Sequence, residues 1–278
     1  MASHGYVVAG ICGPYTPPLV LFPNGTEILG NELGQCAFRD ENELNERKRT
    51  LLSVWCDDMR FVLDTVFEFK DSSGIGAESS KGISQSNNDE DTAQRAGLPE
   101  LCEIIDLTKI GAFGHSFGGT TAVLVSQIDE RCRAAICMDG FFEEVDGSAD
   151  RVVAKPFLYI AARSVEEPNM VPPGHREHRG HRGHFANGWV LRAKGFIHAS
   201  FSDGPLFIFS ATRKVTEFVI RIIGVADNPL GSVPGDRVIE MTRSCVKAFF
   251  DQYLKNQETF YQSGKSPFPE ADLERLPE

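Results

Sequence analysis

This sequence lacks an excess of positive charge, a long apolar run and closely paired cysteines, and each absence excludes a class of protein. Its 39 Asp and Glu residues outnumber 28 Lys and Arg residues, giving a formal net charge of −11. Nucleic-acid backbones are bound by basic surfaces, so we expect no nucleic-acid partner. Apolar runs such as FLYIAA and PLFIFSA are shorter than the roughly 20 residues of a membrane-spanning helix. We therefore expect a soluble chain.

The cysteines and the first residues add two further exclusions. Seven cysteines are an odd number, and they are scattered without close pairs. This spacing is typical of buried or unreactive thiols rather than of a disulfide framework or a zinc cluster. The start, MASHGYVVAG, has no basic region followed by an apolar core, so no signal peptide is predicted. The compartment stays open.

The chain is long enough, with 278 residues of which 41% are hydrophobic, to bury a substantial core. We expect one domain over residues 1–278. Short apolar runs alternate with helical stretches, which predicts an α/β fold with a mainly parallel sheet and helices on both faces. The expected buried strands are residues 6–11 (YVVAGI), 109–115, 133–139 and 155–162.

Other segments are expected outside the sheet. Residues 18–25, PLVLFPNG, are an extended piece that ends in an Asn-Gly turn. Apolar side chains at three-to-four-residue spacing predict a helix between Asp58 and Phe69, and the buried stretch after Ser116 predicts another. Residues 239–256 form a C-terminal helix with one apolar stripe: Met241, Cys245, Phe249 and Tyr253.

Three segments raise questions of order and contact. Residues 71–97 are polar and rich in Gly and Ser, so we expect a disordered insertion. Residues 174–184 alternate His, Arg and Gly and indicate a solvated loop. Residues 214–226, KVTEFVIRIIGVA, predict a helix whose apolar face packs on the sheet, with transient contact to a membrane surface as the alternative.

The stretch KIGAFGHSFGG contains the pattern G-x-S-x-G, with Ser116 between Gly114 and Gly118. In this pattern the serine occupies a sharp strand-to-helix turn, and side chains at the glycine positions would collide with the neighbouring backbone. The five residues alone are a weak signal, because glycine-rich turns containing serine are common. A buried strand before and a helix after supply the required context, so Ser116 is the predicted nucleophile.

A serine nucleophile needs a base to take its proton and an acid to orient that base. In this arrangement the order along the chain is Ser, then Asp or Glu, then His. Asp139 ends the next apolar strand, where open α/β sheets gather functional groups. It is the predicted acid, although a turn or helix-capping role also suits an aspartate there.

Five histidines follow Ser116, so the base has to be chosen among them. Four lie in the His/Arg-rich loop: His175, His178, His181 and His184. Clustered imidazoles can bind zinc, but neighbouring arginines repel a cation and the loop offers no fixed geometry, so we expect no metal site and no cofactor. His198 is flanked by Phe196, Ile197 and Phe201, which can shield it from water. His198 is the predicted base.

Several motifs together resemble the platelet-activating factor acetylhydrolase family of α/β-hydrolases, in its plasma and isoform II branch. They are SHGYVVAGI, VLFPNG, DDMRFVLD, GHSFGGTTA, CMDGF, GFIHASFSD and AFFDQYLKN. The resemblance covers nearly the whole chain apart from the polar insertion and the His/Arg-rich loop. It implies the α/β-hydrolase fold, with Ser116 as nucleophile, Asp139 as acid and His198 as base.

The resemblance also implies an activity, namely calcium-independent removal of short or oxidised acyl chains from the sn-2 position of phospholipids. The backbone N–H of Phe117 would give one oxyanion donor. Family members carry the loop of the second donor before the segment that resembles SHGYVVAGI, so we expect an N-terminally shortened fold without that loop. The alternatives are a general carboxylesterase, an acyltransferase, and a catalytically impaired protein that binds lipid.

Overall fold

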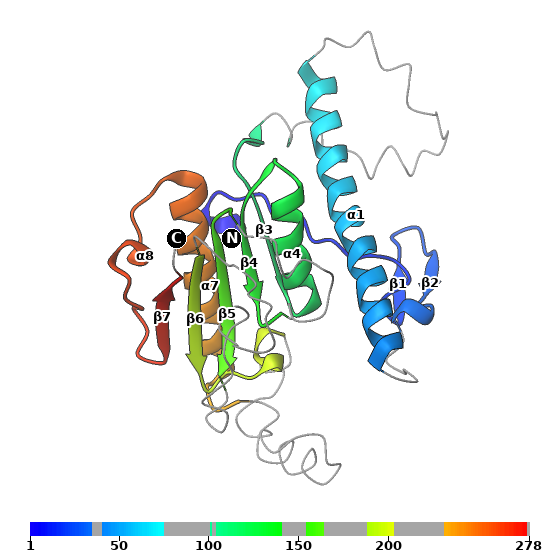
Figure 1. Cartoon of the computed structure of the whole chain (residues 1–278). Helices are drawn as coiled ribbons and strands as arrows, with labels where there is room; N and C mark the ends of the chain where they lie inside the picture. Colours follow the sequence, from blue (N-terminus) through cyan, green and yellow to red (C-terminus); the bar gives the residue numbers. More distant parts are fainter. Residues whose placement is uncertain are drawn as a thin grey trace. The chain divides into compact units, whose positions relative to one another are not determined.

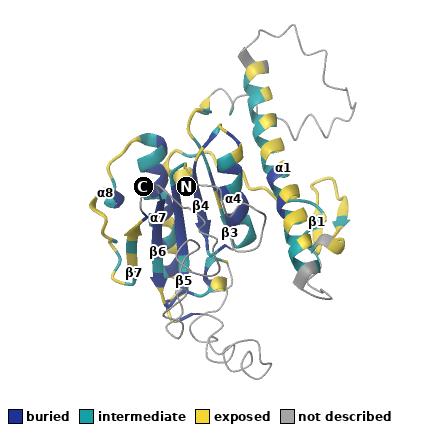
Figure 2. Ribbon diagram, in the orientation of Figure 1, coloured by how far each residue is buried: buried dark blue, intermediate teal, exposed yellow. Residues whose placement is uncertain are grey.

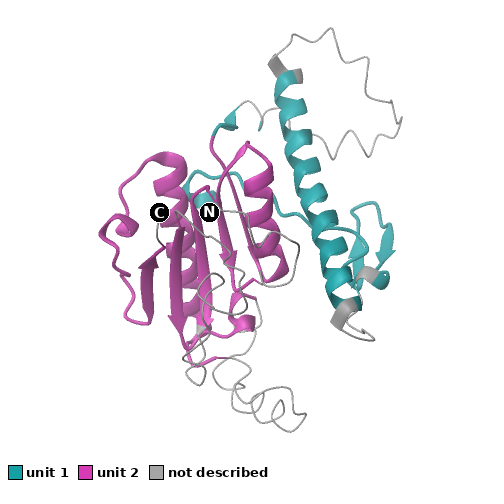
Figure 3. Cartoon of the chain, viewed as in Figure 1, with its two compact units in different colours: residues 1–108 teal, residues 109–278 magenta. Residues whose placement is uncertain are grey.

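The computed structural model describes residues 1–34, 41–74, 101, 104–140, 154–163, 188–202 and 231–276. The chain divides into two compact units, Met1–Thr108 and Lys109–Glu278 (Figure 3). Each unit is described here by itself. The expectation of a single domain over the whole chain stays a prediction, as does that of an N-terminally shortened fold.

The second unit is built on a five-stranded sheet (Figure 1). In spatial order its strands are β3 (Ile110–His115), β4 (Cys132–Met138), β5 (Phe157–Arg163), β6 (Gly188–Lys194) and β7 (Ala271–Arg275). Neighbours from β3 to β6 pair in parallel, and β7 pairs antiparallel with β6. The predicted mainly parallel sheet is confirmed. The carboxyl ends of four strands therefore meet at one edge.

Two helices cover opposite faces of this sheet, α4 (Phe117–Ile128) and α7 (Gly235–Lys255). Phe113 contacts Phe250 of α7, with ring centroids 6.0 Å apart. A side chain at Gly114, one residue further along β3, would instead meet the backbone of α4. Because successive residues of a strand point to opposite faces, the two helices lie on different sides, as predicted.

The core of this unit lies in the central strands, which are largely buried, and on one face of α7 (Figure 2). Ile136 and Leu158, on β4 and β5, are completely buried. The predicted stripe on α7 is confirmed by burial at Met241, Cys245 and Phe249, whereas its fourth member, Tyr253, is only half-buried. The helical stretch after Ser116 is confirmed as well, and burial of its Thr and Val side chains offsets their weak helix propensity.

The sequence did not predict β6 and β7. Strand β7 has the sequence ADLER, which carries too little apolar character to identify a strand. Cross-strand ion pairs hold it to β6, at 2.8 Å between Lys194 and Asp272 and at 2.8 Å between Arg192 and Glu274. An edge strand has one face and one side in water, so charged residues are compatible with it.

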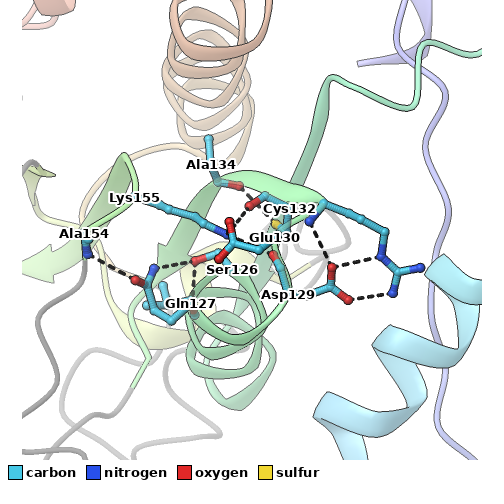
Figure 4. A network of polar contacts seen from close by, with 10 residues as sticks. Ser126, Gln127, Asp129, Glu130, Cys132, Ala134, Ala154 and Lys155 are labelled. Atoms are coloured by element: carbon cyan, nitrogen blue, oxygen red, sulfur yellow. Dashed lines mark hydrogen bonds and ion pairs between the residues drawn. The ribbon is translucent and has the colours of Figure 1, made fainter.

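A polar network joins the segments at the end of the sheet where the parallel strands β4 and β5 begin (Figure 4). Lys155, just before β5, donates to the carbonyls of Asp129 at 2.9 Å and Cys132 at 3.0 Å. The Asp129 carboxylate accepts two hydrogen bonds from the Arg131 guanidinium, at 2.9 and 2.6 Å. The side chain of Gln127 accepts a backbone hydrogen bond from Ala154 at 3.1 Å. The end of α4 and the beginnings of β4 and β5 are therefore fixed to one another.

The first unit contains a hairpin and one long helix. Strand β1 (Leu19–Leu21) pairs antiparallel with β2 (Glu27–Leu29). The turn between them places Gly25 at φ 82°, so the predicted extended piece with its Asn-Gly turn is confirmed. Helix α1 (Glu41–Gly74) extends well beyond the predicted residues 58–69. Charged residues in its first turns support it through pairs such as Arg47 and Glu43, at 2.8 Å.

Two expectations for this unit are wrong. Residues 6–11 form no strand, and Val7 and Val8 are 52% and 46% exposed. A β-branched run becomes a strand only where another strand can pair with it, and no strand in the described ranges pairs with residues 6–11. The disordered insertion was expected over residues 71–97, but residues 71–74 are helical and form the last turn of α1.

Other expectations lie outside the described residues: the remaining polar insertion over residues 75–97, the His/Arg-rich loop at 174–184 and the helix over 214–226. No helix within the described ranges is long and apolar enough to cross a bilayer. Five cysteines are described and all are free thiols, four of them buried. Burial raises the pKa of Cys132 to about 11 and that of Cys245 to about 12, so both remain protonated thiols.

Replacing Phe249 by Ala should lower the free energy of unfolding by about 3–5 kcal/mol, because its fully buried ring would leave a cavity. Ile239→Ala, on the same helix at a position that is 39% exposed, is the matched control and should have a much smaller effect. Urea unfolding followed by circular dichroism measures both. Equal losses in the two variants would contradict the described packing of α7.

Candidate active site

Ser116 lies between the end of β3 and the first turn of α4, at φ 55° and ψ −125°. A positive φ is uncommon for a residue with a side chain and stores backbone strain. The Ser116 N–H donates to the Met138 carbonyl of β4 at 2.8 Å, which ties the turn to the sheet. The hydroxyl does not cap α4. It is therefore available to another side chain.

Glycines allow this turn to form. A side chain at Gly114 would collide with the backbone of Gly118, as the sequence motif implies. A side chain at Gly119 would lie 2.7 Å from the Cys137 sulfur, so the first turn of α4 can approach β4 closely. The close approach directs the N-terminus of α4 at the site, and Phe117 is the first helical residue. Backbone N–H groups and the positive end of the helix dipole thus lie beside Ser116.

Asp139 follows β4 directly and also has a positive φ, of 52°. Its N–H donates to the Ile160 carbonyl of β5 at 2.8 Å. Its carboxylate accepts a hydrogen bond from the Ala162 N–H at 2.9 Å through one oxygen, Oδ1. The second oxygen, Oδ2, lies 2.7 Å from Nδ1 of His198. The carboxylate is therefore held from both sides and is largely buried.

His198 follows β6 and begins a short 3₁₀ turn, η4 (His198–Phe201). Its Nε2 lies 2.9 Å from the Ser116 hydroxyl oxygen. Two reciprocal hydrogen bonds between Ile197 and Ser200, at 2.9 and 2.8 Å, hold the turn. Gly195, at φ 78°, turns the chain from β6 towards it. The structure thus brings together the three side chains that the sequence singled out, from three different strand ends.

The tautomer of His198 follows from its two neighbours. A carboxylate can only accept, so Nδ1 carries the proton and donates to Asp139. Nε2 is then unprotonated and accepts the hydrogen bond of the Ser116 hydroxyl. A hydroxyl, an imidazole and a carboxylate in this sequence form the arrangement that activates an oxygen nucleophile.

One detail of the prediction for His198 is wrong. Its side chain is 45% exposed and is not shielded by the flanking aromatic residues. Phe196 is buried and packs against Phe201, with centroids 5.7 Å apart. Phe201 in turn faces His115, at 5.6 Å. These aromatic rings therefore pack beside the site and do not cover the imidazole of His198.

Two further features of the site were missed by sequence reasoning. His115 lies against His198, with ring centroids 4.5 Å apart, but the motif treats its position as variable. Gly140 is packed so closely that a side chain would lie 2.6 Å from the Ser116 carbonyl oxygen, and the Tyr159 hydroxyl donates to its carbonyl at 3.1 Å. The only available signal was sequence adjacency to Ser116 and Asp139.

Residues 79–265 match the family model of platelet-activating factor acetylhydrolase, isoform II. The match covers more than half of the chain and includes Ser116, Asp139 and His198. The chain belongs to the platelet-activating factor acetylhydrolase, isoform II family. The resemblance seen in the sequence is confirmed.

Individual members of the acetylhydrolase family are only distantly similar to this chain. The platelet-activating factor acetylhydrolase of Bos taurus is 24% identical over 173 residues, and that of Canis lupus familiaris is 23% identical over 165 residues. Each alignment covers 59% of this chain and 34% of the relative. The chain thus matches about a third of the length of these relatives.

The fold of this chain also resembles a solved structure, that of a ferulic acid esterase from Streptomyces cinnamoneus. The TM-score is 0.60 at 23% sequence identity, over 92% of this chain and 62% of the esterase. At this identity the likeness concerns the fold. Together with the mainly parallel sheet, it confirms the predicted α/β-hydrolase fold.

Metal binding is one further role that the geometry of the described residues tests. Within the ranges that the structure describes, no group of three or more His, Cys, Asp or Glu side chains is arranged to hold a metal ion. His198 and Asp139 are already bonded to each other and to Ser116 or Ala162. The four histidines of the His/Arg-rich loop lie outside the described residues.

Adding a methyl group at Gly140 should disturb the site, because the new Cβ would approach the Ser116 carbonyl and the Thr120 hydroxyl within 2.8 Å. We expect Gly140→Ala to lower the free energy of unfolding by about 1–3 kcal/mol. Gly10→Ala, where a Cβ meets nothing within 4 Å, is the control. Chemical denaturation measures the free energy of unfolding of both variants. A wild-type value in Gly140→Ala would contradict the described packing.

Stability should fall in mild acid through His115. Burial, followed by the nearby His198, lowers the pKa of His115 below its ordinary value of 6.5. Below pH 6.5 the unfolded chain then binds more protons at this site than the folded chain, so the free energy of unfolding decreases as the pH falls. His115→Phe removes this contribution. When the pH is lowered from 7 to 5, the melting temperature of His115→Phe should decrease less than that of the wild type. An equal decrease would contradict the lowered pKa of His115.

Proposed function

We propose that this chain is a serine esterase that removes short or oxidised acyl groups from the sn-2 position of phospholipids, without calcium. The observation that carries the proposal is the hydrogen-bonded series from Ser116 through His198 to Asp139, at 2.9 and 2.7 Å. Family membership supports the ester class. The phospholipid substrate is what the resemblance to the acetylhydrolase family implies, and the chain matches about a third of the length of the named acetylhydrolases.

In the proposed first step, Nε2 of His198 takes the Ser116 proton while the serine oxygen attacks the ester carbonyl. The resulting imidazolium is stabilised by Asp139, whose position is set by the Ala162 N–H. The tetrahedral intermediate collapses when the bond to the lyso-phospholipid oxygen breaks. That oxygen takes the proton from His198, and the acyl group remains on Ser116.

In the second step a water molecule replaces the alcohol. His198 takes its proton, and the water oxygen bonds to the acyl carbon. The tetrahedral intermediate then collapses: the bond to the Ser116 oxygen breaks, that oxygen takes the proton back from His198, and a free carboxylic acid is released. Negative charge develops on the carbonyl oxygen in both steps. The backbone N–H of Phe117, at the N-terminus of α4, is the proposed first donor to this oxygen.

The proposal is tested with the full chain on a series of acyl esters, from acetyl to decanoyl, and on phospholipids with short or long sn-2 chains. Turnover should fall as the acyl chain lengthens and should be unaffected by calcium or a chelator. Ser116→Ala and His198→Ala should each lower kcat by about 10⁴- to 10⁶-fold. Ser263→Ala, which changes an exposed serine on the short helix α8 (Phe260–Ser263), should behave like the wild type.

Other outcomes separate the alternatives. Equal turnover across acyl lengths and head groups would favour a general carboxylesterase. Transfer of the acyl group to an added alcohol in preference to water would favour an acyltransferase. A folded wild-type chain that neither turns over any ester nor reacts with a fluorophosphonate at Ser116 would overturn the proposal, and lipid binding unaffected by Ser116→Ala would then support a non-catalytic role.

A further inference from the structure

Three hydrogen bonds from β5 hold the two residues that follow β4, Asp139 and Gly140. The Asp139 N–H donates to the Ile160 carbonyl at 2.8 Å. The Ala162 N–H donates to Oδ1 of Asp139 at 2.9 Å. The Tyr159 hydroxyl donates to the Gly140 carbonyl at 3.1 Å. Of these three bonds only the last uses a side chain of β5, so a substitution can remove it and leave the backbone of the strand unchanged.

The ring of Tyr159 packs in the core, whereas its hydroxyl reaches the site. Tyr159 pairs with Cys137 in the parallel register of β5 and β4. Both residues belong to the buried cluster that also contains Val123 of α4, and Tyr159 is 8% exposed. A tyrosine combines an apolar ring with a polar tip. A phenylalanine would therefore fill the same space, but it could not bond the Gly140 carbonyl.

Gly140 lies between the turn that carries the acid and the turn that carries the nucleophile. A side chain at Gly140 would lie 2.6 Å from the Ser116 carbonyl oxygen and 2.8 Å from the Thr120 hydroxyl oxygen. The backbone at Gly140 therefore packs directly against the first turn of α4. Because Asp139 is the preceding residue, a displacement of Gly140 would move the carboxylate relative to Ser116.

Asp139 needs this support because its backbone conformation is unfavourable. Its φ is 52°, and a residue with a side chain stays at a positive φ only where its surroundings enforce it. Its Oδ2 has to lie 2.7 Å from Nδ1 of His198. The Ala162 N–H fixes the other oxygen, and the Tyr159 hydroxyl fixes the peptide group that follows Gly140. The two bonds together set the direction of the carboxylate.

We propose that Tyr159 is a positioning residue for the acid: its hydroxyl holds the Gly140 carbonyl and thereby keeps the Asp139 carboxylate directed at Nδ1 of His198. The inference rests on the proposed function for its effect on turnover. Its structural part, the orientation of the carboxylate, does not depend on that function. Tyr159 acts through Asp139 and is not itself a catalytic residue.

Tyr159→Phe removes the hydroxyl and keeps the ring. The matched control is Tyr261→Phe, because Tyr261 is also buried and its hydroxyl also donates to a backbone carbonyl, that of Cys245 on α7, at 3.2 Å. Both variants should have a lowered melting temperature. Misplacement of a reacting group by about 1 Å lowers rates by about 10²-fold. Since the Ala162 bond remains, we expect Tyr159→Phe to lower kcat by roughly 10-fold with KM unchanged, and Tyr261→Phe to keep the wild-type kcat.

These rates are measured on ester substrates at a temperature where all three proteins are folded. A wild-type kcat in folded Tyr159→Phe would overturn the proposal. Losses of activity in both variants that only follow the loss of folded protein would mean that Tyr159 is structural, and would overturn it as well. A raised KM with an unchanged kcat would indicate substrate binding instead of positioning, with the same consequence.

A measurement that needs no turnover separates this inference from the proposed function. In alkaline solution, where the ring is neutral, the ring ¹⁵N chemical shifts of His198 report which nitrogen carries the proton. The His198 signals are those missing from the spectrum of His198→Ala. In the wild type and in Tyr261→Phe, Asp139 should keep the proton on Nδ1. In Tyr159→Phe a part of the rings should carry it on Nε2.

Full retention of the Nδ1 proton in folded Tyr159→Phe would overturn the positioning role, even in a chain that hydrolyses no ester. A wild type without turnover that shows the expected difference between Tyr159→Phe and Tyr261→Phe would support the positioning role and contradict only the proposed function.

Discussion

The positive φ of Ser116 is the constraint on which the rest of the site depends. This backbone conformation presents the hydroxyl at the carboxyl edge of the sheet rather than burying it between strand and helix. It is unfavourable for a serine and persists because the surroundings enforce it. The Met138 carbonyl holds the serine N–H, and Gly114, Gly119 and Gly140 leave the space that the turn occupies.

The parallel sheet converts this local feature into a site. Strands β3, β4 and β6 end at the same edge, so Ser116, Asp139 and His198 meet although the last is 82 residues from the first. Asp139 shares the positive φ of Ser116, and Nε2 of His115 is buried without a hydrogen-bond partner in the part of the chain that the structure describes. Unfavourable features thus accumulate at this edge. The opposite edge carries the bonds of Lys155 and Asp129, which fix where the strands begin.

The core supplies the stability that these features require. Apolar side chains of β4, of β5 and of one face of α7 are almost completely buried, and α4 covers the other face of the sheet with small residues. Small residues let α4 approach β4, and this proximity brings its N-terminus to Ser116. The packing of the helix and the electrostatics of the site therefore have the same origin. Larger side chains in the first turn would move the helix dipole away from the nucleophile.

The sequence by itself determined the local parts of this protein. The glycines around Ser116, the apolar strand before Asp139 and the stripe on α7 each depend on neighbours in the chain, and a short pattern expresses them. Tertiary structure alone decided which elements pair. The apolar run at residues 6–11 forms no strand, whereas the polar segment ADLER forms β7 because β6 offers it a partner. It also placed His115 beside His198, because this ring contact arises only when two strand ends meet.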